Sequence, residues 1–162
     1  MLAAAAAAAA VAAGAPSMSR PAPSSVDNVS FDTVDYAEGE DCPKEAYDCV
    51  VCVSTVKWIH LNRGDEGVKN LFKKVFATLK PGGCFIFEAQ PWKSYRKKRM
   101  LTPQIKTTFK TIELKPAMFH EYLMETVGFA LYEDLGQTTD HATQTFATSA
   151  GCQRSMTVYF KA

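Results

Sequence analysis

YDCVVCVSTV, residues 47–56, decides the fold that we predict for this chain. It is a continuous run of apolar and β-branched residues, typical of a parallel strand that is covered on both faces. Residues 65–80 carry the apolar stripe of one helix, and the turn PGG at 81–83 ends it. A second apolar strand follows over residues 84–90. Strand, helix and strand therefore predict a right-handed parallel βαβ unit.

Weaker signals on both sides of this unit complete one predicted α/β domain over residues 27–162. They predict a short strand over 28–36, a helix over 115–128, and closing strands over 129–136 and 154–162. The Thr-rich segment 137–153 is predicted to be a mobile loop. Residues 1–26 are expected to form a disordered Ala-rich tail or a targeting segment, because they are low in complexity and almost uncharged.

Composition limits the possible functions. With a net charge of +1 over 162 residues, the whole-chain charge gives no sign of a nucleic-acid partner. Cys49 and Cys52 form a C-x-x-C, but side chains three apart on a strand point to opposite faces, so we expect buried thiols and no metal site. We predict no membrane span, because the Ala-rich stretch is short and weakly apolar. A nuclear or cytoplasmic location is expected, and organellar targeting is the weaker alternative.

Polar side chains collect where the two predicted parallel strands end, which is where α/β sheets bind ligands. The end of the first strand carries Ser54, Lys57, Trp58, His60 and Asn62, several of them in the turn KWIHLNRGD that we predict over residues 57–65. The end of the second strand carries Glu88, Gln90, Pro91, Trp92, Ser94 and Tyr95. Neighbouring parallel strands would bring these two sets to one crevice.

A basic run begins directly after the second strand. Between Glu88 and Glu113 no acidic residue interrupts Lys93, Arg96, Lys97, Lys98, Arg99, Lys106 and Lys110. Trp92, Tyr95 and Phe109 lie among these cations, a mixture that suits an anionic polymer with stackable bases. A solvated charged face is the alternative interpretation.

Three strings of this sequence resemble the bicoid-interacting RNA methyltransferase family: VSTVKWIHLNRGDEG, LKPGGCFIFEAQPWKSY and IELKPAMFHEYL. The resemblance implies a Rossmann-like class I fold that uses S-adenosyl-L-methionine to methylate a 5′-terminal phosphate of RNA. It also implies an RNA partner with a 5′-phosphate end and leaves room for protein partners in an RNA–protein complex.

By position, the resemblance assigns roles to individual residues. Asp35 and Tyr36 would flank the adenine of the cofactor, and Val53 and Ser54 would lie beside it. Lys57, His60 and Asn62 are the catalytic candidates: Lys57 would hold a phosphate, whereas a hydroxyl substrate would need His60 as its base. The RNA-binding candidates are Trp92, Lys93, Tyr95, Arg96, Lys97, Lys98, Arg99 and Lys106.

The chain departs from the family pattern in one respect. The predicted elements correspond to strands 3–7 of a methyltransferase sheet, and strands 1 and 2, with the Gly-rich cofactor loop, are expected to be missing. Cofactor binding by the chain alone is therefore in question. Two other interpretations stay open: a non-catalytic RNA- or partner-binding remnant of the same fold, and a methyltransferase acting on a small molecule or a protein.

Overall fold

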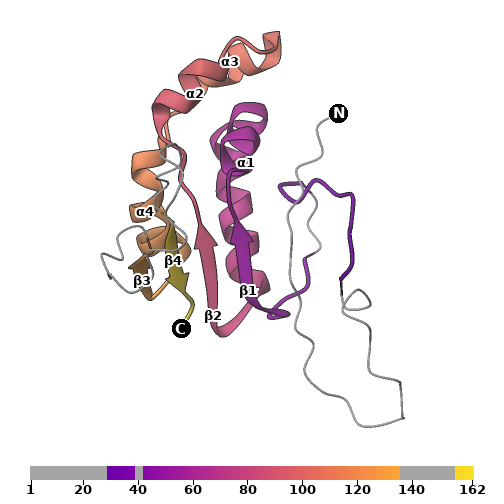
Figure 1. The fold of residues 1–162 in the computed structure, drawn as a ribbon, viewed down its shortest axis with the longest axis vertical. Helices are drawn as coiled ribbons and strands as arrows, with labels where there is room; N and C mark the ends of the chain where they lie inside the picture. Colours follow the sequence, from indigo (N-terminus) through magenta and orange to yellow (C-terminus); the bar gives the residue numbers. More distant parts are fainter. Residues whose placement is uncertain (1–28, 39–41, 136–155) are drawn as a thin grey trace, which may run out of the picture.

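A computed structural model describes residues 29–38, 42–135 and 156–162, and it contains one four-stranded mixed sheet with helices (Figure 1). The strands are β1 (Tyr47–Cys52), β2 (Leu79–Phe87), β3 (Leu131–Asp134) and β4 (Thr157–Phe160). Their order across the sheet is β1-β2-β4-β3. β1 and β2 are parallel, whereas β4 is antiparallel to both β2 and β3. The predicted βαβ unit and the two predicted closing strands are confirmed, but the predicted turn at 81–83 is wrong, because α1 ends at Thr78 and these residues lie within β2.

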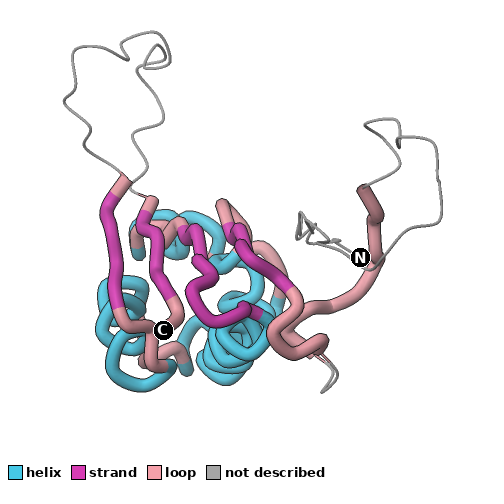
Figure 2. The backbone as a smooth tube through the Cα atoms, turned by 90° about the horizontal axis from the view of Figure 1, so that it is seen from below, coloured by secondary structure: helices cyan, strands magenta, loops and turns pink. Residues whose placement is uncertain are grey.

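Helices cover one face of the sheet (Figure 2), and α2 and α3 lie beyond the carboxyl ends of β1 and β2 (Figure 1). They are α1 (Val56–Thr78), α2 (Trp92–Lys98), α3 (Pro103–Thr111), the short 3-10 helix η1 (Pro116–Met118), α4 (Phe119–Glu121) and the π-helical η2 (Tyr122–Val127). None of the helices in the described ranges is both long and apolar enough to cross a bilayer. The helix predicted over 115–128 consists of three short consecutive helices, η1, α4 and η2. The last of them is capped by Gly128, whose φ is 99°.

The main core lies between the sheet and α1. Phe72 of α1 is fully buried, and its ring centroid is 5.4 Å from both Phe87 and Phe119. Phe85 of β2 stacks on Phe129 at 6.0 Å. These aromatic contacts join α1, β2 and the α4–η2 segment into one cluster. The cluster holds the helices in place against the sheet.

The helix α1 begins nine residues earlier than predicted, so the predicted turn over residues 57–65 is wrong. Its first two turns bury Val56, Lys57, His60 and Leu61, which follow the i, i+3, i+4 spacing of a helix face. Two of these four side chains are polar, so the buried face of the first turns does not appear as a periodic pattern of apolar residues. At Gly64 the backbone has φ 66° and ψ −163°, a conformation open in practice to glycine alone, and it kinks the helix there.

The prediction of a strand over 28–36 is wrong for the part that the structure describes. Residues 29–34 form neither helix nor strand, and the Phe31 side chain is 92% exposed. A strand needs a neighbour for its backbone N–H and C=O groups, and none of the described strands lies beside this segment; β1 is an edge of the sheet. Residues 1–28 and the predicted loop 137–153 lie outside the described residues.

Candidate active site

The carboxyl ends of β1 and β2 lie side by side at one end of the sheet, as the sequence predicts. Cys52 and Phe87 are in register, and the Glu88 amide donates to the Cys52 carbonyl at 3.1 Å. Ser54 leaves β1 with a left-handed φ of 61°, and its hydroxyl donates to the Glu88 carboxylate at 2.9 Å. The polar residues that follow the two strands therefore share one site.

Lys57 sits at the junction of α1, β2 and α2. Only 8% of the residue is exposed, and its ammonium lies 4.9 Å from the centroid of the Trp58 ring. The ammonium donates to the Ser94 hydroxyl at 2.9 Å, and the Lys57 backbone N–H donates to Gln90 Oε1 at 3.2 Å. A positive charge is thus held in a defined position beside both strand ends.

His60 is a buried connector in this structure. Its side chain is fully buried, with Nε2 2.8 Å from Asp65 Oδ1 and Nδ1 3.4 Å from the Tyr95 hydroxyl. The other oxygen of Asp65 accepts from the backbone N–H groups of Glu113 and Leu114 at 2.9 and 3.0 Å. The network ties α1 to α2 and to the segment after α3, so His60 lies behind the strand-end surface and not on it.

Both members of this pair have a pKa below the ordinary value. Burial lowers the pKa of His60, and the hydrogen bond with Asp65 opposes that shift only in part. Burial acts to raise the pKa of Asp65, but the hydrogen bonds with His60 and with the Leu114 and Glu113 amides outweigh it. At neutral pH the pair is therefore a neutral imidazole donating to a carboxylate.

The lowered pKa of His60 predicts that acid weakens the fold below about pH 6.5, the pKa of an unfolded histidine. Between the folded-state pKa and that value the unfolded state binds more protons, so the free energy of unfolding falls as pH falls. Asp65 adds nothing in this window, because its contribution is lost only as pH falls from about 3.8, its ordinary pKa, toward its lowered folded-state pKa. Urea denaturation at pH 7.5, 6.5 and 5.5 measures the slope.

The matched variants for this test are His60→Gln and His120→Gln, since His120 is exposed. His60→Gln should flatten the dependence of unfolding free energy on pH, and His120→Gln should keep it. An unchanged slope in His60→Gln would show that His60 is not the group responsible.

A second hydrophobic cluster holds α2 and α3 against the first turns of α1. Its buried members are Leu61, Tyr95, Ile105 and Ile112. Trp92 is half-buried and stacks on Phe109, with ring centroids 4.8 Å apart and an angle of 13°. Burial of the Tyr95 ring raises the pKa of its hydroxyl, which stays protonated. Tyr95 is fully buried, so its predicted contact with RNA does not fit this conformation.

The remaining RNA-binding candidates lie on the outside of α2, α3 and their connection. The exposed ones are Lys93, Arg96, Lys97, Lys98, Arg99 and Lys106. Asn62 is exposed as well, on α1, where its amide donates to the Trp58 carbonyl at 2.8 Å. The basic side chains thus form a solvent-facing strip next to the Lys57 site, which we call the basic strip.

The structure does not bring the four predicted cofactor residues together. Asp35 accepts from the Arg63 guanidinium at 2.6 Å, and the Tyr36 hydroxyl is 3.3 Å from Thr78 Oγ1 at the last residue of α1. Val53 and Ser54 precede the opposite end of that helix. Residues 29–38 have no strand to fix them beside β1, which explains the separation.

One important residue of the site was missed at the level of sequence. Asp65 has no predicted role, yet its carboxylate bonds His60 of the same helix and accepts from the Glu113 and Leu114 amides of a distant segment. Its position directly after Gly64 was the available signal, because a kink there frees the side chain to turn inward. Within the described ranges, no three His, Cys, Asp or Glu side chains are grouped so that they could hold a metal ion.

Comparison with known proteins gives clear relatives for most of the chain. It is 42% identical over 140 residues to the human "7SK snRNA methylphosphate capping enzyme", covering 83% of this chain and 19% of that protein. It is 38% identical over 118 residues to the "Probable RNA methyltransferase At5g51130" of Arabidopsis thaliana, covering 73% of this chain and 37% of the relative. A Drosophila melanogaster "U6 snRNA methylphosphate capping enzyme Amus" is 38% identical over 91 residues, covering 56% and 30%.

The chain thus spans well under half the length of these relatives. Among solved structures, a Thermotoga maritima protein described as a SAM-dependent methyltransferase aligns with a TM-score of 0.49 at 17% identity, covering 78% of this chain and 61% of that one. The family profile described as Bicoid-interacting protein 3 matches residues 47–161, from the start of β1 to the residue after β4. The chain therefore belongs to the Bicoid-interacting protein 3 (Bin3) family.

Proposed function

We propose that this protein is an RNA methyltransferase that transfers a methyl group from S-adenosyl-L-methionine to a 5′-terminal phosphate. The observation that carries the proposal is the held ammonium of Lys57, which donates to Ser94 Oγ at 2.9 Å beside two converging strand ends. The names of the human and Drosophila relatives, which describe methylphosphate capping of small nuclear RNAs, support the same chemistry.

A phosphate nucleophile explains why a lysine and not a general base stands at this edge. A phosphate monoester has a second pKa near 6, so its oxygens are already ionised at neutral pH. One oxygen forms a bond to the methyl carbon, the carbon–sulfur bond breaks, and sulfur keeps the electron pair; no proton has to move. Lys57 would hold the anion in line, and good alignment of bound reactants contributes about 7–11 kcal/mol to such a step.

The described residues fit part of the methyl donor. Val53, 41% exposed, and the hydroxyl of Ser54 lie at the end of β1 next to the Glu88 carboxylate, where anionic and polar groups suit a sulfonium ion. Asp35 and Tyr36 do not join them, so the described residues do not form a site for the adenine half. The ligand supplies a methyl group bound to positive sulfur, and the chain's residues here orient the acceptor.

The basic strip is proposed to carry the RNA behind its 5′ end. Its cations are exposed and follow Trp92 and Ser94, so a strand whose terminal phosphate reaches Lys57 would pass along them. Arginine and lysine side chains of this kind bind phosphates without reading sequence. The strip therefore supplies affinity, and the strand ends supply the reaction.

Salt dependence of RNA binding tests the strip. The double variant Lys97→Gln and Lys98→Gln should bind a 5′-phosphate RNA more weakly, with the slope of log K against log salt reduced by about 1.4, since each neutralised phosphate of a single strand contributes about 0.7. Fluorescence anisotropy at 50 to 200 mM salt gives the slope. The control is Lys44→Gln with Lys73→Gln, two exposed lysines outside α2 and α3.

Two results would contradict the proposed function. Salt-independent or absent RNA binding would favour a small-molecule or protein substrate. Salt-dependent RNA binding by the full-length protein, with neither heat nor a thermal shift on adding S-adenosyl-L-methionine, would favour an RNA-binding protein without catalysis.

A further inference from the structure

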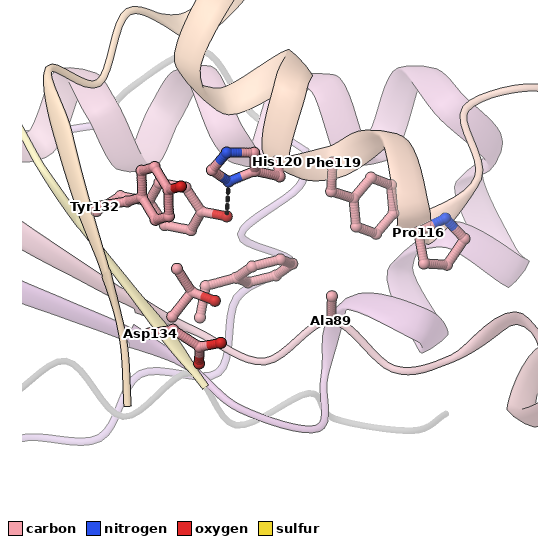
Figure 3. Close-up of a pocket in the computed structure, with 9 residues that line it drawn as sticks. Ala89, Pro116, Phe119, His120, Tyr132 and Asp134 are labelled. Atoms are coloured by element: carbon pink, nitrogen blue, oxygen red, sulfur yellow. Dashed lines mark hydrogen bonds between the residues drawn. The ribbon is translucent and has the colours of Figure 1, made fainter. Parts of the chain in front are cut away.

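A pocket of about 300 Å³ lies between the sheet and the η1–α4 segment, and none of its residues belongs to the predicted site (Figure 3). This volume is at the small end of the range for ligand pockets. The lining residues are Phe87, Ala89, Pro116, Phe119, His120, Tyr132, Asp134, Thr157 and Tyr159. They come from β2 and the segment after it, from β3 and β4, and from η1 and α4.

The pocket opens at the same edge of the sheet as the Lys57 site. Thr157 is in register with both Phe87 and Asp134, so the ends of three strands form its floor. Ala89 lines the pocket, and the next residue, Gln90, accepts the hydrogen bond from the Lys57 backbone. Strands lie about 4.8 Å apart, so β4 is roughly 10 Å from β1, and β3, which carries Asp134, is roughly 14 Å from it. A nucleotide with its phosphate near β1 would therefore have to extend across β2 and β4 to reach Asp134.

The walls combine aromatic surface with a few polar groups. The Tyr132 ring, on a residue that is 52% exposed, meets His120 edge to face with centroids 4.4 Å apart. His120 Nδ1 is 3.1 Å from the Tyr159 hydroxyl, which fixes the imidazole against the sheet. Asp134 lies on the same side of β3 as Tyr132, and Figure 3 shows its carboxylate below the two rings. Flat apolar walls with a carboxylate at one side suit a planar base that offers N–H groups.

We propose that this pocket holds the base of the first nucleotide of the RNA, and that Asp134 gives it a preference for guanine. The inference rests on the proposed function, because it places the nucleotide whose phosphate reaches Lys57. Unstacked bases bind by stacking on aromatic side chains and by hydrogen bonds to their Watson–Crick edge. Guanine presents two adjacent donors there, N1–H and the N2 amino group, and a carboxylate can accept from both.

The other three bases fit the carboxylate less well. Adenine and cytosine place an acceptor nitrogen next to a single amino donor, and uracil places its one N–H between two carbonyl oxygens. Each would set an acceptor against the Asp134 charge. A carboxylate has room for about four hydrogen bonds, so the ligand adds to the contacts that Asp134 already makes.

The test uses the full-length protein and four RNAs. All four carry a 5′-phosphate, and they differ only in the base of the first nucleotide. The kcat/KM for methyl transfer and the equilibrium affinity should both favour G by about 10- to 100-fold, the discrimination expected of a bidentate contact. Asp134→Asn should remove most of that preference, chiefly because kcat/KM and affinity fall for the RNA that begins with G. Glu133→Gln, which changes the neighbouring exposed acid on the other side of β3, should leave the preference intact.

A second variant separates stacking from base choice. Tyr132→Leu keeps apolar bulk but removes the ring, and should weaken binding of all four RNAs by a similar factor. Equal use of the four ends by the wild type, or an unchanged preference in Asp134→Asn, would overturn the pocket proposal while leaving 5′-phosphate methylation standing. If no RNA is methylated, the proposed function fails, and the affinities of the four RNAs alone decide whether the pocket selects guanine.

Discussion

Replacing Lys57 with alanine is expected to reduce methyl transfer to a 5′-phosphate RNA by about 10²- to 10³-fold, the loss typical when one preorganised electrostatic contact is removed from an active site. Lys57 lies at the junction of α1, β2 and α2, where its ammonium donates to Ser94 and its backbone N–H donates to Gln90. The variant leaves the basic strip intact, so RNA affinity should change little while kcat falls. Single-turnover transfer of a labelled methyl group by the full-length protein gives the rate.

Two controls make the Lys57 result specific. Lys73→Ala removes an exposed lysine from the same helix and should leave the rate unchanged. His60→Gln should have a mild effect at a temperature where the variant is folded, because His60 is buried behind the site. The opposite pattern, with a severe loss in His60→Gln and a mild one in Lys57→Ala, would mean that the acceptor is a hydroxyl group needing a base.

The largest effect on stability is expected for Asp65→Ala. This change deletes the acceptor of the hydrogen bonds from His60 Nε2 and from the Glu113 and Leu114 amides, at 2.8, 2.9 and 3.0 Å. We expect the free energy of unfolding to drop by about 2–4 kcal/mol, because hydrogen bonds to a charged group are strong and their former donors stay partly buried. Urea denaturation at pH 7.5 measures the drop.

The neighbouring residue supplies the matched control for Asp65. Glu66→Ala removes a carboxylate that is 77% exposed and paired with Lys69, and should stay within about 0.5 kcal/mol of the wild type. Asp65→Asn keeps one carbonyl oxygen and should fall between the two. Equal stability of Asp65→Ala and Glu66→Ala would show that the link between α1 and residues 113–114 contributes nothing to folding.

The sheet could be predicted because its strands bury apolar side chains in long runs. The runs at β1 and β2 and the stripe of Val68, Leu71, Phe72 and Val75 on α1 carry their own signal, and each was predicted in type. The first turns of α1 were not, because polar Lys57 and His60 occupy buried positions. Their burial depends on partners far along the chain, Ser94, Tyr95 and Asp65, which local patterns do not reveal.

The helices α2 and α3 escaped prediction for a related reason. They are short and rich in cations, and only Tyr95 and Ile105 are buried within them. The same limit applies to the site: the meeting of the two strand ends follows from a parallel βαβ unit, whereas the burial of Tyr95 follows from long-range packing. The place of the candidate site was predictable, and the exposure of its side chains was not.

The helices α2 and α3 are held by a hydrophobic cluster of their own. Leu61 of α1 packs with α2 and α3, whereas Val56, Val68 and Phe72 of the same helix pack with the sheet. Because α2 and α3 are joined to the rest of the molecule through this second cluster, they can open at a different free energy from the sheet and α1. Amide hydrogen exchange should therefore separate residues 92–112 from the sheet, and RNA bound along α2 and α3 would slow exchange there without a matching change in the strands.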